Sequence, residues 1–310
     1  MRLLVTGASG FIGRNLIRAL PDDWDVTATF CNSDSFPGFV HSLGRPRTHV
    51  LRIDLATQSA GSLLAGAADV FDACVFLAAN GDPARSVAEP AFDLISNTLA
   101  LIHVAERVRF KRFVYLSSGA VYDGLVGPVS PKVQVAPLLP YAISKLASER
   151  YLQHFQRAHS IDDLFIVRFF GAYGPFEPPR KIYNRMIRQF AFAHDPRFAI
   201  RGDGRNLIDA MYIDDAIRAI LVLLDTSSRG AIFDCASGAP VTLTTLVETA
   251  ADTFGLKAEI TYTGSVPEHI EFYSVDSTMT SEYQFTPRVA LKDGLRRFAE
   301  FLRNQPGLQT

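Results

Sequence analysis

Two side chains of this sequence have the types and the spacing for acid–base chemistry. Tyr141 and Lys145 are four residues apart in a segment that is predicted to be a helix. Because residues i and i+4 lie one turn apart on the same helix face, the phenol and the ammonium group can share one pocket. The nearby cation would lower the pKa of Tyr141 from its ordinary value of ~10 toward neutrality. Tyr141 is therefore a candidate general acid and base, although such pairs also occur on protein surfaces.

Two further elements could position a substrate and a cofactor. Ser117 and Ser118 end a predicted strand, and hydroxyl groups at the carboxyl end of a parallel strand can orient a substrate oxygen. Gly7, Gly10 and Gly13 follow the first predicted strand and open a helix; they suit a tight turn, a close approach to a pyrophosphate and close helix packing. Simple turns remain the alternative for both elements, and no ATP-cleaving P-loop motif occurs.

The first half of the chain alternates short apolar runs with segments of helical period, which is typical of a parallel sheet with crossover helices. The predicted strands are Leu3–Thr6, Val26–Phe30, His49–Ile53, Ala73–Leu77, Arg112–Ser117 and Leu164–Phe169. The predicted helices are Phe11–Leu20, one capped by Asn97 and ending near Arg109, one from Tyr141 to near His159, Ile182–Ala193, Asp214–Leu224, Leu243–Phe254 and Leu291–Arg303. We expect an α/β protein: a Rossmann-type, doubly wound domain in residues 1–170 and a smaller mixed α/β substrate lobe in residues 171–310, with segments that return to the first domain.

Composition excludes several classes of protein. The chain has 310 residues, of which 48% are hydrophobic and 20% charged, as in ordinary globular proteins. Its net charge of −1 gives no general attraction to nucleic acid or to an anionic membrane. Three scattered cysteines and histidines without metal-binding spacing predict neither disulfides nor a metal site. No signal peptide or membrane-spanning segment is recognised, so we expect a cytoplasmic protein.

Together these motifs resemble the extended short-chain dehydrogenase/reductase superfamily, and specifically its NAD-dependent epimerase/dehydratase family, which acts on sugar nucleotides. The resemblance covers nearly the whole chain. It is carried by Asn97 and by the segments Thr6–Gly13 (TGxxGxxG), Leu77–Ala79 (LAA), Lys111–Ser118, Pro140–Lys145 (PYxxSK), Arg168–Pro175 (RxxNxYGP) and Gly202–Asp215 (GDGxxxRDxxYVDD).

The resemblance implies a role for each of these residues. Ser118 takes the position of the catalytic Ser/Thr, Tyr141 is the acid/base, and Lys145 holds the nicotinamide ribose. The implied cofactor site consists of Gly7, Gly10, Phe11, Ile12, Gly13, Phe30, Asn32, Asp54, Leu55, Leu77, Ala78, Ala79, Asn97, Ser117, Tyr141, Lys145 and Phe170. The implied nucleotide-sugar site consists of Gly81, Ser118, Gly171, Arg205 and Tyr212. The resemblance also implies a homodimer.

The sequence departs from the family pattern beside the catalytic hydroxyl and at the end of the second strand. Dehydratases of the family follow that hydroxyl with an Asp/Glu pair, whereas Gly119 and Ala120 stand here, so dehydration is not expected. The acidic residue that binds the adenosine ribose in NAD enzymes is replaced by Phe30 or Cys31, and no arginine stands beside them for a 2′-phosphate. The cofactor is therefore NAD or NADP.

Two residues that bind the sugar nucleotide are also replaced. Gly171 stands in place of the asparagine of RxxNxYGP, and Ile208 in place of the arginine expected near the diphosphate. Arg205, Arg180 and Lys181 are candidates to replace that arginine, although each is better explained as a solvated surface charge.

These residues predict an NAD(P)-dependent sugar-nucleotide 4-epimerase. Tyr141 would remove the proton of the C4 hydroxyl group while C4 gives up hydride, and Ser118 would hydrogen-bond the same oxygen. The transient 4-keto sugar would then turn and take the hydride back on its other face. One alternative is an NADPH-dependent reductase of a 4-keto sugar nucleotide, which would use the same residues in one direction. Another is a non-catalytic dinucleotide-binding sensor or scaffold, which would be expected to lose Tyr141 or Lys145.

Overall fold

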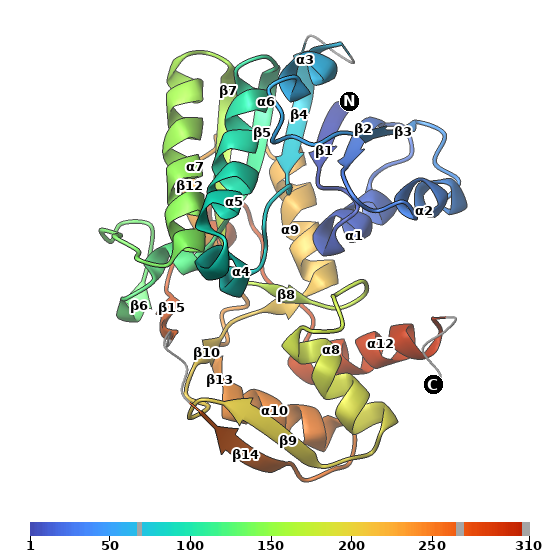
Figure 1. Cartoon of the computed structure of the whole chain (residues 1–310), viewed down its shortest axis with the longest axis vertical. Coiled ribbons are helices and arrows are strands. Elements are labelled where there is room, and N and C mark those ends of the chain that lie inside the picture. Colours follow the sequence, from blue (N-terminus) through green and yellow to red (C-terminus); the bar gives the residue numbers. More distant parts are fainter. Residues whose placement is uncertain (67–69, 265–269, 306–310) are drawn as a thin grey trace.

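A seven-stranded, wholly parallel sheet forms the centre of the molecule, with strand order β12-β7-β5-β4-β1-β2-β3 (Figure 1). It is seen in a computed structural model that describes residues 1–66, 70–264 and 270–305. The predicted Rossmann-type, doubly wound fold is confirmed, and each predicted strand overlaps one strand of the sheet. The seven strands of the sheet are β1 (Arg2–Thr6), β2 (Asp25–Phe30), β3 (Thr48–Arg52), β4 (Val70–Phe76), β5 (Arg109–Ser118), β7 (Ile161–Phe169) and β12 (Ile232–Cys235), of which β12 was not predicted.

Helices cover both faces of the sheet because successive side chains of a strand point to opposite sides. Leu3 and Val5 of β1 belong to one buried apolar cluster, together with residues of α1 (Phe11–Ala19) and α9 (Ile213–Asp225). Leu4, between them, belongs to a second cluster. That cluster includes residues of α3 (Ala60–Ala65), α6 (Ala100–Ala105) and α7 (Pro140–Arg157).

A smaller group of elements lies below the sheet in Figure 1. Its helices pack on one another and share the first apolar cluster with α9, so the core is continuous across both parts. The elements are α8 (Ile182–Ile187) with its π-helical continuation (Arg188–Phe192), α10 (Leu243–Thr253), α12 (Leu291–Arg303) and the strand pairs β9 (Arg197–Arg201) with β14 (Glu259–Thr263) and β10 (Leu207–Ile208) with β13 (Val241–Thr242).

Shorter elements surround the carboxyl edge of the sheet or connect the two parts. These elements are α2 (Phe36–Ser42), α4 (Pro83–Ala88), α5 (Pro90–Leu94), the 3-10 turn η2 (Gly119–Tyr122), β6 (Val126–Val129) with β15 (Glu271–Ser274), β8 (Ala172–Tyr173) with β11 (Met211–Tyr212), and α11 (Thr278–Ser281). No helix within the described ranges is both long and apolar enough to span a lipid bilayer.

The prediction that Asn97 caps a helix is wrong. Asn97 lies inside a π-helical turn, η1 (Ile95–Leu99), which continues into α6, and α6 ends at Ala105. The Asn97 side chain is buried, and its amide group donates to Asp93 and Ser144. Its oxygen accepts the backbone N–H of Asn80. The Asn97 side chain is therefore held by contacts with other elements and does not cap a free N–H group at the start of a helix.

The turn after β1 brings three backbone segments into direct contact. Gly7 has a φ of +62°, and a Cβ atom there would lie 2.7 Å from the backbone nitrogen of Ala78. A Cβ atom on Gly13 would lie 2.6 Å from the Cα atom of Ala8. The Oγ1 atom of Thr6 accepts hydrogen bonds from the backbone N–H groups of Leu77 and Ala78. The glycine turn, α1 and the segment after β4 therefore fit together only because these positions lack side chains.

This close fit predicts a difference between two glycines with similar backbone angles. Gly44 has a φ of +64° but open space where a methyl group would extend, so Gly44→Ala should cost only the left-handed conformation, about 1 kcal/mol. Gly7→Ala adds a clash with Ala78 and should lower the free energy of unfolding by at least about 3 kcal/mol. Urea denaturation of both variants measures this, and equal losses would contradict it.

Candidate active site

The three residues predicted to be catalytic lie together at the carboxyl end of β5. Ser118 is the last residue of β5, and its hydroxyl group accepts the backbone N–H of Ala120 at 3.1 Å and lies close enough to the phenol of Tyr141 to affect its pKa. Lys145 follows one turn later on α7 and is buried, with 4% of its surface exposed. Its ammonium group donates to the carbonyl oxygen of Leu116 at 2.9 Å and lies 6.0 Å from the centre of the Tyr141 ring.

Burial shifts the protonation of both titratable groups in this cluster. It raises the pKa of Tyr141, to which the negative charge of Asp93 adds, while the hydrogen bond with Ser118 opposes the shift. Burial lowers the pKa of Lys145 to about 8, against the opposing charges of Asp93 and Glu149. The prediction that Lys145 brings the pKa of Tyr141 toward neutrality is therefore wrong for this structure, because loss of hydration dominates.

Asp93 is a buried carboxylate that the sequence analysis did not identify. It lies on α5 with 1% of its surface exposed. It accepts hydrogen bonds from the amides of Asn80 and Asn97, at 2.8 and 2.9 Å, and from the hydroxyl group of Ser144 at 2.5 Å. Ser144 immediately precedes Lys145, so Asp93 joins α5 and η1 to the catalytic helix. Neither its spacing nor a motif marks it in the sequence.

A second buried carboxylate, Glu149, lies one turn beyond Lys145 on the same face of α7. Its oxygens accept hydrogen bonds from Arg168 at 3.1 and 2.9 Å and from the hydroxyl group of Ser117 at 2.6 Å. Arg168 also donates to the phenol of Tyr122, which in turn donates to Asp234 at 2.7 Å. The i+4 spacing after Lys145 could have marked Glu149 from the sequence, because it repeats the spacing from Tyr141 to Lys145.

The residues predicted to bind a cofactor lie along the same edge of the sheet, because they follow the carboxyl ends of neighbouring parallel strands. Several already have partners within the protein: Phe30 is buried against the ring of Phe36, Ser117 is bound to Glu149, and Asn97 is bound to Asp93 and Ser144. By strand, the others are Gly7, Gly10, Phe11, Ile12 and Gly13 after β1; Asn32 after β2; Asp54 and Leu55 after β3; Leu77, Ala78 and Ala79 after β4; and Phe170 after β7.

The structure leaves little room for an acidic side chain beside Ser118. A Cβ atom on Gly119 would lie 3.1 Å from ring atoms of Phe170. The Phe170 ring therefore occupies the direction in which a side chain of residue 119 would extend. The aromatic ring and the glycine fit one another.

Two of the predicted nucleotide-sugar residues, Arg205 and Tyr212, have partners within the protein, and Gly171 lies between β7 and β8. The guanidinium of Arg205 is exposed and bonds the carboxylate of Asp203 at 2.6 Å. Tyr212 is buried, and its ring lies edge-on to that of Tyr173. Gly171 has a φ of +127°, and a Cβ atom there would lie 3.4 Å from the side chain of Ala210.

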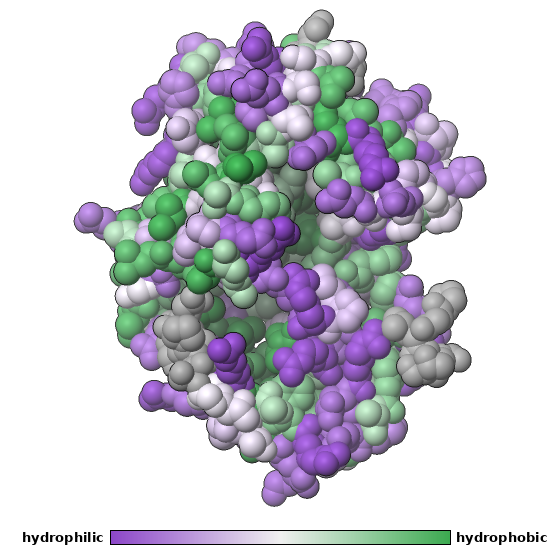
Figure 2. Space-filling model, in the orientation of Figure 1, coloured by the Kyte–Doolittle hydropathy of each residue, from purple (hydrophilic) through white to green (hydrophobic). Residues whose placement is uncertain are grey.

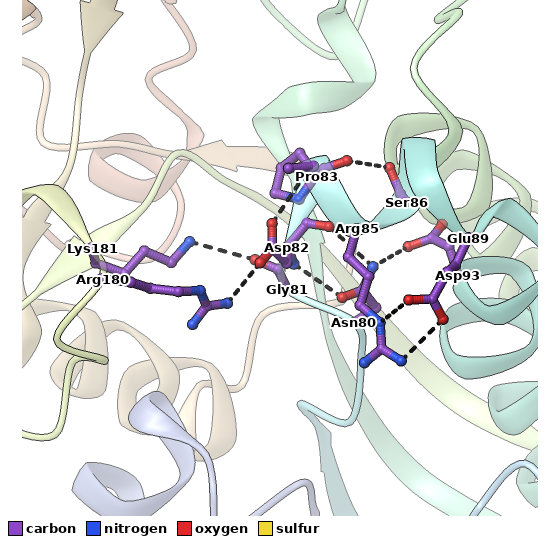
Figure 3. A network of polar contacts seen from close by, with 11 residues as sticks. Asn80, Gly81, Asp82, Pro83, Arg85, Ser86, Glu89, Asp93, Arg180 and Lys181 are labelled. Atoms are coloured by element: carbon purple, nitrogen blue, oxygen red, sulfur yellow. Dashed lines mark hydrogen bonds and ion pairs between the residues drawn. The ribbon is translucent and has the colours of Figure 1, made fainter. Parts of the chain in front are cut away.

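Charged side chains connect the two parts of the molecule at Gly81 and Asp82 (Figure 3). Arg180, from the loop before α8, forms an ion pair with Asp82 at 2.9 Å. The ammonium group of Lys181 reaches the carbonyl oxygen of Gly81 at 3.5 Å. The amide of Asn80 bonds both the carbonyl oxygen of Asp82 and the carboxylate of Asp93, so this contact is continuous with the network under the catalytic helix. The surface between the upper and lower parts is hollowed in Figure 2, with hydrophilic residues along much of its edge.

The described residues include no group of three His, Cys, Asp or Glu side chains that could hold a metal ion.

Comparison with known proteins identifies the family. The model of the NAD dependent epimerase/dehydratase family matches residues 3–236. The chain belongs to this family. The predicted resemblance and the prediction of an enzyme of the extended short-chain dehydrogenase type are confirmed.

Relatives of the chain within the epimerase/dehydratase family carry more than one activity. A dTDP-glucose 4,6-dehydratase of Streptomyces niveus is 29% identical over 98% of this chain and 93% of its own length. A UDP-glucose 4-epimerase of Mycolicibacterium smegmatis is 28% identical over 98% of this chain and 99% of its own. Among solved structures, a UDP-glucuronic acid 4-epimerase from Bacillus cereus, in complex with UDP-glucuronic acid and NAD, has a TM-score of 0.86. The two sequences are 26% identical, and the match covers 98% of this chain and 99% of the Bacillus cereus chain.

The buried Glu149–Arg168 pair predicts a large loss of stability on removal of one partner. Glu149→Ala would leave the guanidinium of Arg168 buried with one carboxylate fewer, at a cost of about 3–5 kcal/mol in the free energy of unfolding. Glu248→Ala, on the exposed face of α10, is the matched control and should change it by less than about 0.5 kcal/mol. Urea denaturation compares the two, and similar values would show that the pair contributes little.

The loop that carries Arg180 also predicts a pH dependence of stability. Glu177 is buried, and burial raises its pKa to about 8. The folded state therefore holds this proton more tightly than the unfolded state, and the wild type loses stability as the pH rises from 5 to 8. The introduced glutamine side chain of the Glu177→Gln variant is neutral throughout. The free energy of unfolding of this variant minus that of the wild type should therefore rise by at least about 1 kcal/mol between pH 5 and 8. A difference that stays constant between pH 5 and 8 would disprove this.

Proposed function

We propose that this protein is a nicotinamide-dependent sugar-nucleotide 4-epimerase. The observation that carries the proposal is the contact between Ser118 and Tyr141, with Lys145 one turn away, at the edge of the sheet where the glycine turn lies. A hydroxyl group and a phenol that lie this close together can both approach one substrate oxygen. The similarity to 4-epimerases of UDP-glucose and UDP-glucuronic acid supports this reaction and this class of substrate.

The residues at this edge fit a nicotinamide dinucleotide. Gly7 and Gly13 have no space for a side chain, and no side chain caps the amino end of α1, whose N–H groups suit a pyrophosphate. Lys145 is placed to bind the ribose hydroxyl groups next to the nicotinamide. When bound, such a cofactor would accept hydride from the sugar and return it.

The side chains of the protein complete the proton transfers. Tyr141 takes the proton of the C4 hydroxyl group and returns it to the same oxygen, while Ser118 donates a hydrogen bond to that oxygen. Since burial raises the pKa of Tyr141, the phenolate needs stabilisation from Ser118 and from the positive charge of Lys145. Asp93 and Glu149 oppose the effect of burial on Lys145 and so help to keep it charged.

The surroundings of Ser118 support epimerisation over the dehydration that some relatives perform. Gly119 and Ala120 provide no acid or base, and the ring of Phe170 lies where a side chain of residue 119 would extend. A second candidate, NADPH-dependent reduction of a 4-keto sugar nucleotide, uses the same three side chains. It is favoured by the absence of an acidic residue at Phe30 and Cys31.

We also propose that the protein is a homodimer. Large apolar side chains are exposed on α5, η1 and α7, and α5 packs against α7. A second copy of the chain could cover this surface, as apolar interfaces between subunits do. The exposed residues are Leu94, Ile95, Leu99, Ile143 and Tyr151.

Replacement of one phenol tests the proposed reaction. Tyr141→Phe should lower the rate of epimerisation of UDP-glucose or UDP-glucuronic acid by at least about 100-fold, because the proton acceptor is lost. Tyr262→Phe, on an exposed position of β14 in the smaller part, should leave the rate unchanged. Nuclear magnetic resonance of the sugar products gives the rate, and equilibrium dialysis shows that the cofactor still binds.

The stoichiometry of the cofactor separates the two candidate reactions. Epimerisation should proceed with a catalytic amount of cofactor and no net change in nicotinamide absorbance. A fall in absorbance in step with product would establish the reductase instead. If neither product forms and Tyr141→Phe changes nothing, the enzyme proposal is wrong.

A further inference from the structure

A positively charged side chain lies beside the carboxyl end of β2 although none is adjacent in the sequence. Arg14, in the first turns of α1, donates from Nη2 to the hydroxyl oxygens of Ser33 at 3.1 Å and Ser35 at 3.3 Å. Its Nε atom donates to the carbonyl oxygen of Ser9 in the glycine turn, at 3.0 Å. The guanidinium group therefore joins the glycine turn to the loop after β2.

Aromatic rings hold this guanidinium group in place. Its central carbon lies 4.8 Å from the ring centre of Phe39, 5.7 Å from that of Phe36 and 5.9 Å from that of Phe176. These rings also displace water, and the partial burial of Arg14 lowers its pKa. The position of the charge is thus fixed before any ligand binds, which reduces the entropy lost on binding.

No carboxylate pairs with Arg14 among the residues that the structure describes. Its hydrogen-bond partners are two neutral hydroxyl groups and one carbonyl oxygen. Asp34 lies between the two serines in the sequence, but its carboxylate pairs with Arg52 at 2.9 Å. A half-buried guanidinium with only neutral partners keeps its capacity for an anion, and the two hydroxyl groups can rotate to donate to the same anion.

The location indicates which anion fits. In a doubly wound fold, the end of the second strand lies beside the adenosine ribose of a bound dinucleotide. NAD enzymes place a carboxylate there, which binds the ribose hydroxyl and repels a phosphate. Phe30 and Cys31 carry no such charge. Of the neighbouring carboxylates, Asp34 is paired with Arg52, which also donates to the carbonyl oxygen of Cys31, and Asp54 acts on Cys31 through its charge.

We propose that Arg14, Ser33 and Ser35 form a binding site for the 2′-phosphate of NADP and that the protein prefers NADP to NAD. The inference rests on the proposed nicotinamide-dependent function. It would set this chain apart from the similar 4-epimerase whose structure contains NAD. A search for arginine beside the end of β2 misses the site, because the charge comes from α1.

Binding measurements test the site without any assay of activity. Calorimetric titration of the whole protein with NADP+, NAD+, 2′,5′-ADP and 5′-AMP should show at least about tenfold tighter binding of each 2′-phosphorylated ligand than of its counterpart. Arg14→Met keeps a long side chain between the aromatic rings but removes the charge. It should weaken NADP+ and 2′,5′-ADP by at least about tenfold and leave NAD+ and 5′-AMP within about twofold.

Arg18→Met is the matched control, because Arg18 lies one turn further along α1 and also approaches Phe176, at 5.7 Å. It should change none of the four affinities. Thermal denaturation checks the fold of each variant. If Arg14→Met does not fold, the double variant Ser33→Ala/Ser35→Ala, which retains Arg14, should still weaken only the 2′-phosphorylated ligands.

The outcomes separate this site from the proposed function. Equal affinities for NADP+ and NAD+ in the wild type, or an unchanged preference in the folded variants, overturn the 2′-phosphate site and leave the proposed function standing. Binding of 2′,5′-ADP that depends on Arg14, without binding of either dinucleotide, supports the site and overturns the nicotinamide-dependent function. If none of the four ligands binds, both proposals are overturned.

Discussion

The burial of one ammonium group is the constraint on which the active-site architecture depends. Lys145 is enclosed between α7 and the end of β5, where an unpaired charge would cost several kcal/mol, on the order of a protein's whole net stability. The backbone carbonyl oxygen of Leu116 accepts a hydrogen bond from the ammonium group, and Asp93 and Glu149 supply opposite charge. Neither carboxylate touches Lys145 in an ion pair among the described contacts. Both act through the field inside the protein.

Each of these carboxylates is held by its own network, and the two networks bind different parts of the fold to α7. Asp93 fixes α5 and η1 to the helix through Ser144 and Asn97. Glu149 fixes the ends of β5 and β7 through Ser117 and Arg168. The helix that carries the acid–base pair is therefore attached on both sides by buried polar contacts, which require specific geometry, in addition to apolar packing, which does not.

Local patterns were sufficient to predict six of the seven strands of the sheet, but not β12. The strands follow from short β-branched runs, the glycine turn from its spacing, and the meeting of Ser118 with Tyr141 from a strand end and a helix face. Contacts between distant segments were not predictable in this way. Asn97 looked like a helix cap because its partners, Asn80 and Ser144, lie elsewhere in the chain.

The same limit applies to charge. The sequence places Lys145 near Tyr141 but contains no measure of how much water each group loses, and that loss sets the direction of both pKa shifts. It also separates Arg14 from Ser33 by a whole strand, whereas the fold places their side chains in contact. Burial and long-range proximity are properties of the packed chain, and single positions do not report them.

The alignment of Tyr141, Lys145 and Glu149 on one face of α7 has a consequence for how this enzyme can change over evolutionary time. A single inserted or deleted residue between Tyr141 and Glu149 would rotate everything beyond it by ~100° and move at least one of the three off the shared face. The helix can therefore accept substitutions but not changes of length. The loop that carries Arg180 and Lys181 has no such periodic requirement, since its contacts to Asp82 and Gly81 lie at the rim. That loop can therefore change in length without disturbing the shared face of α7.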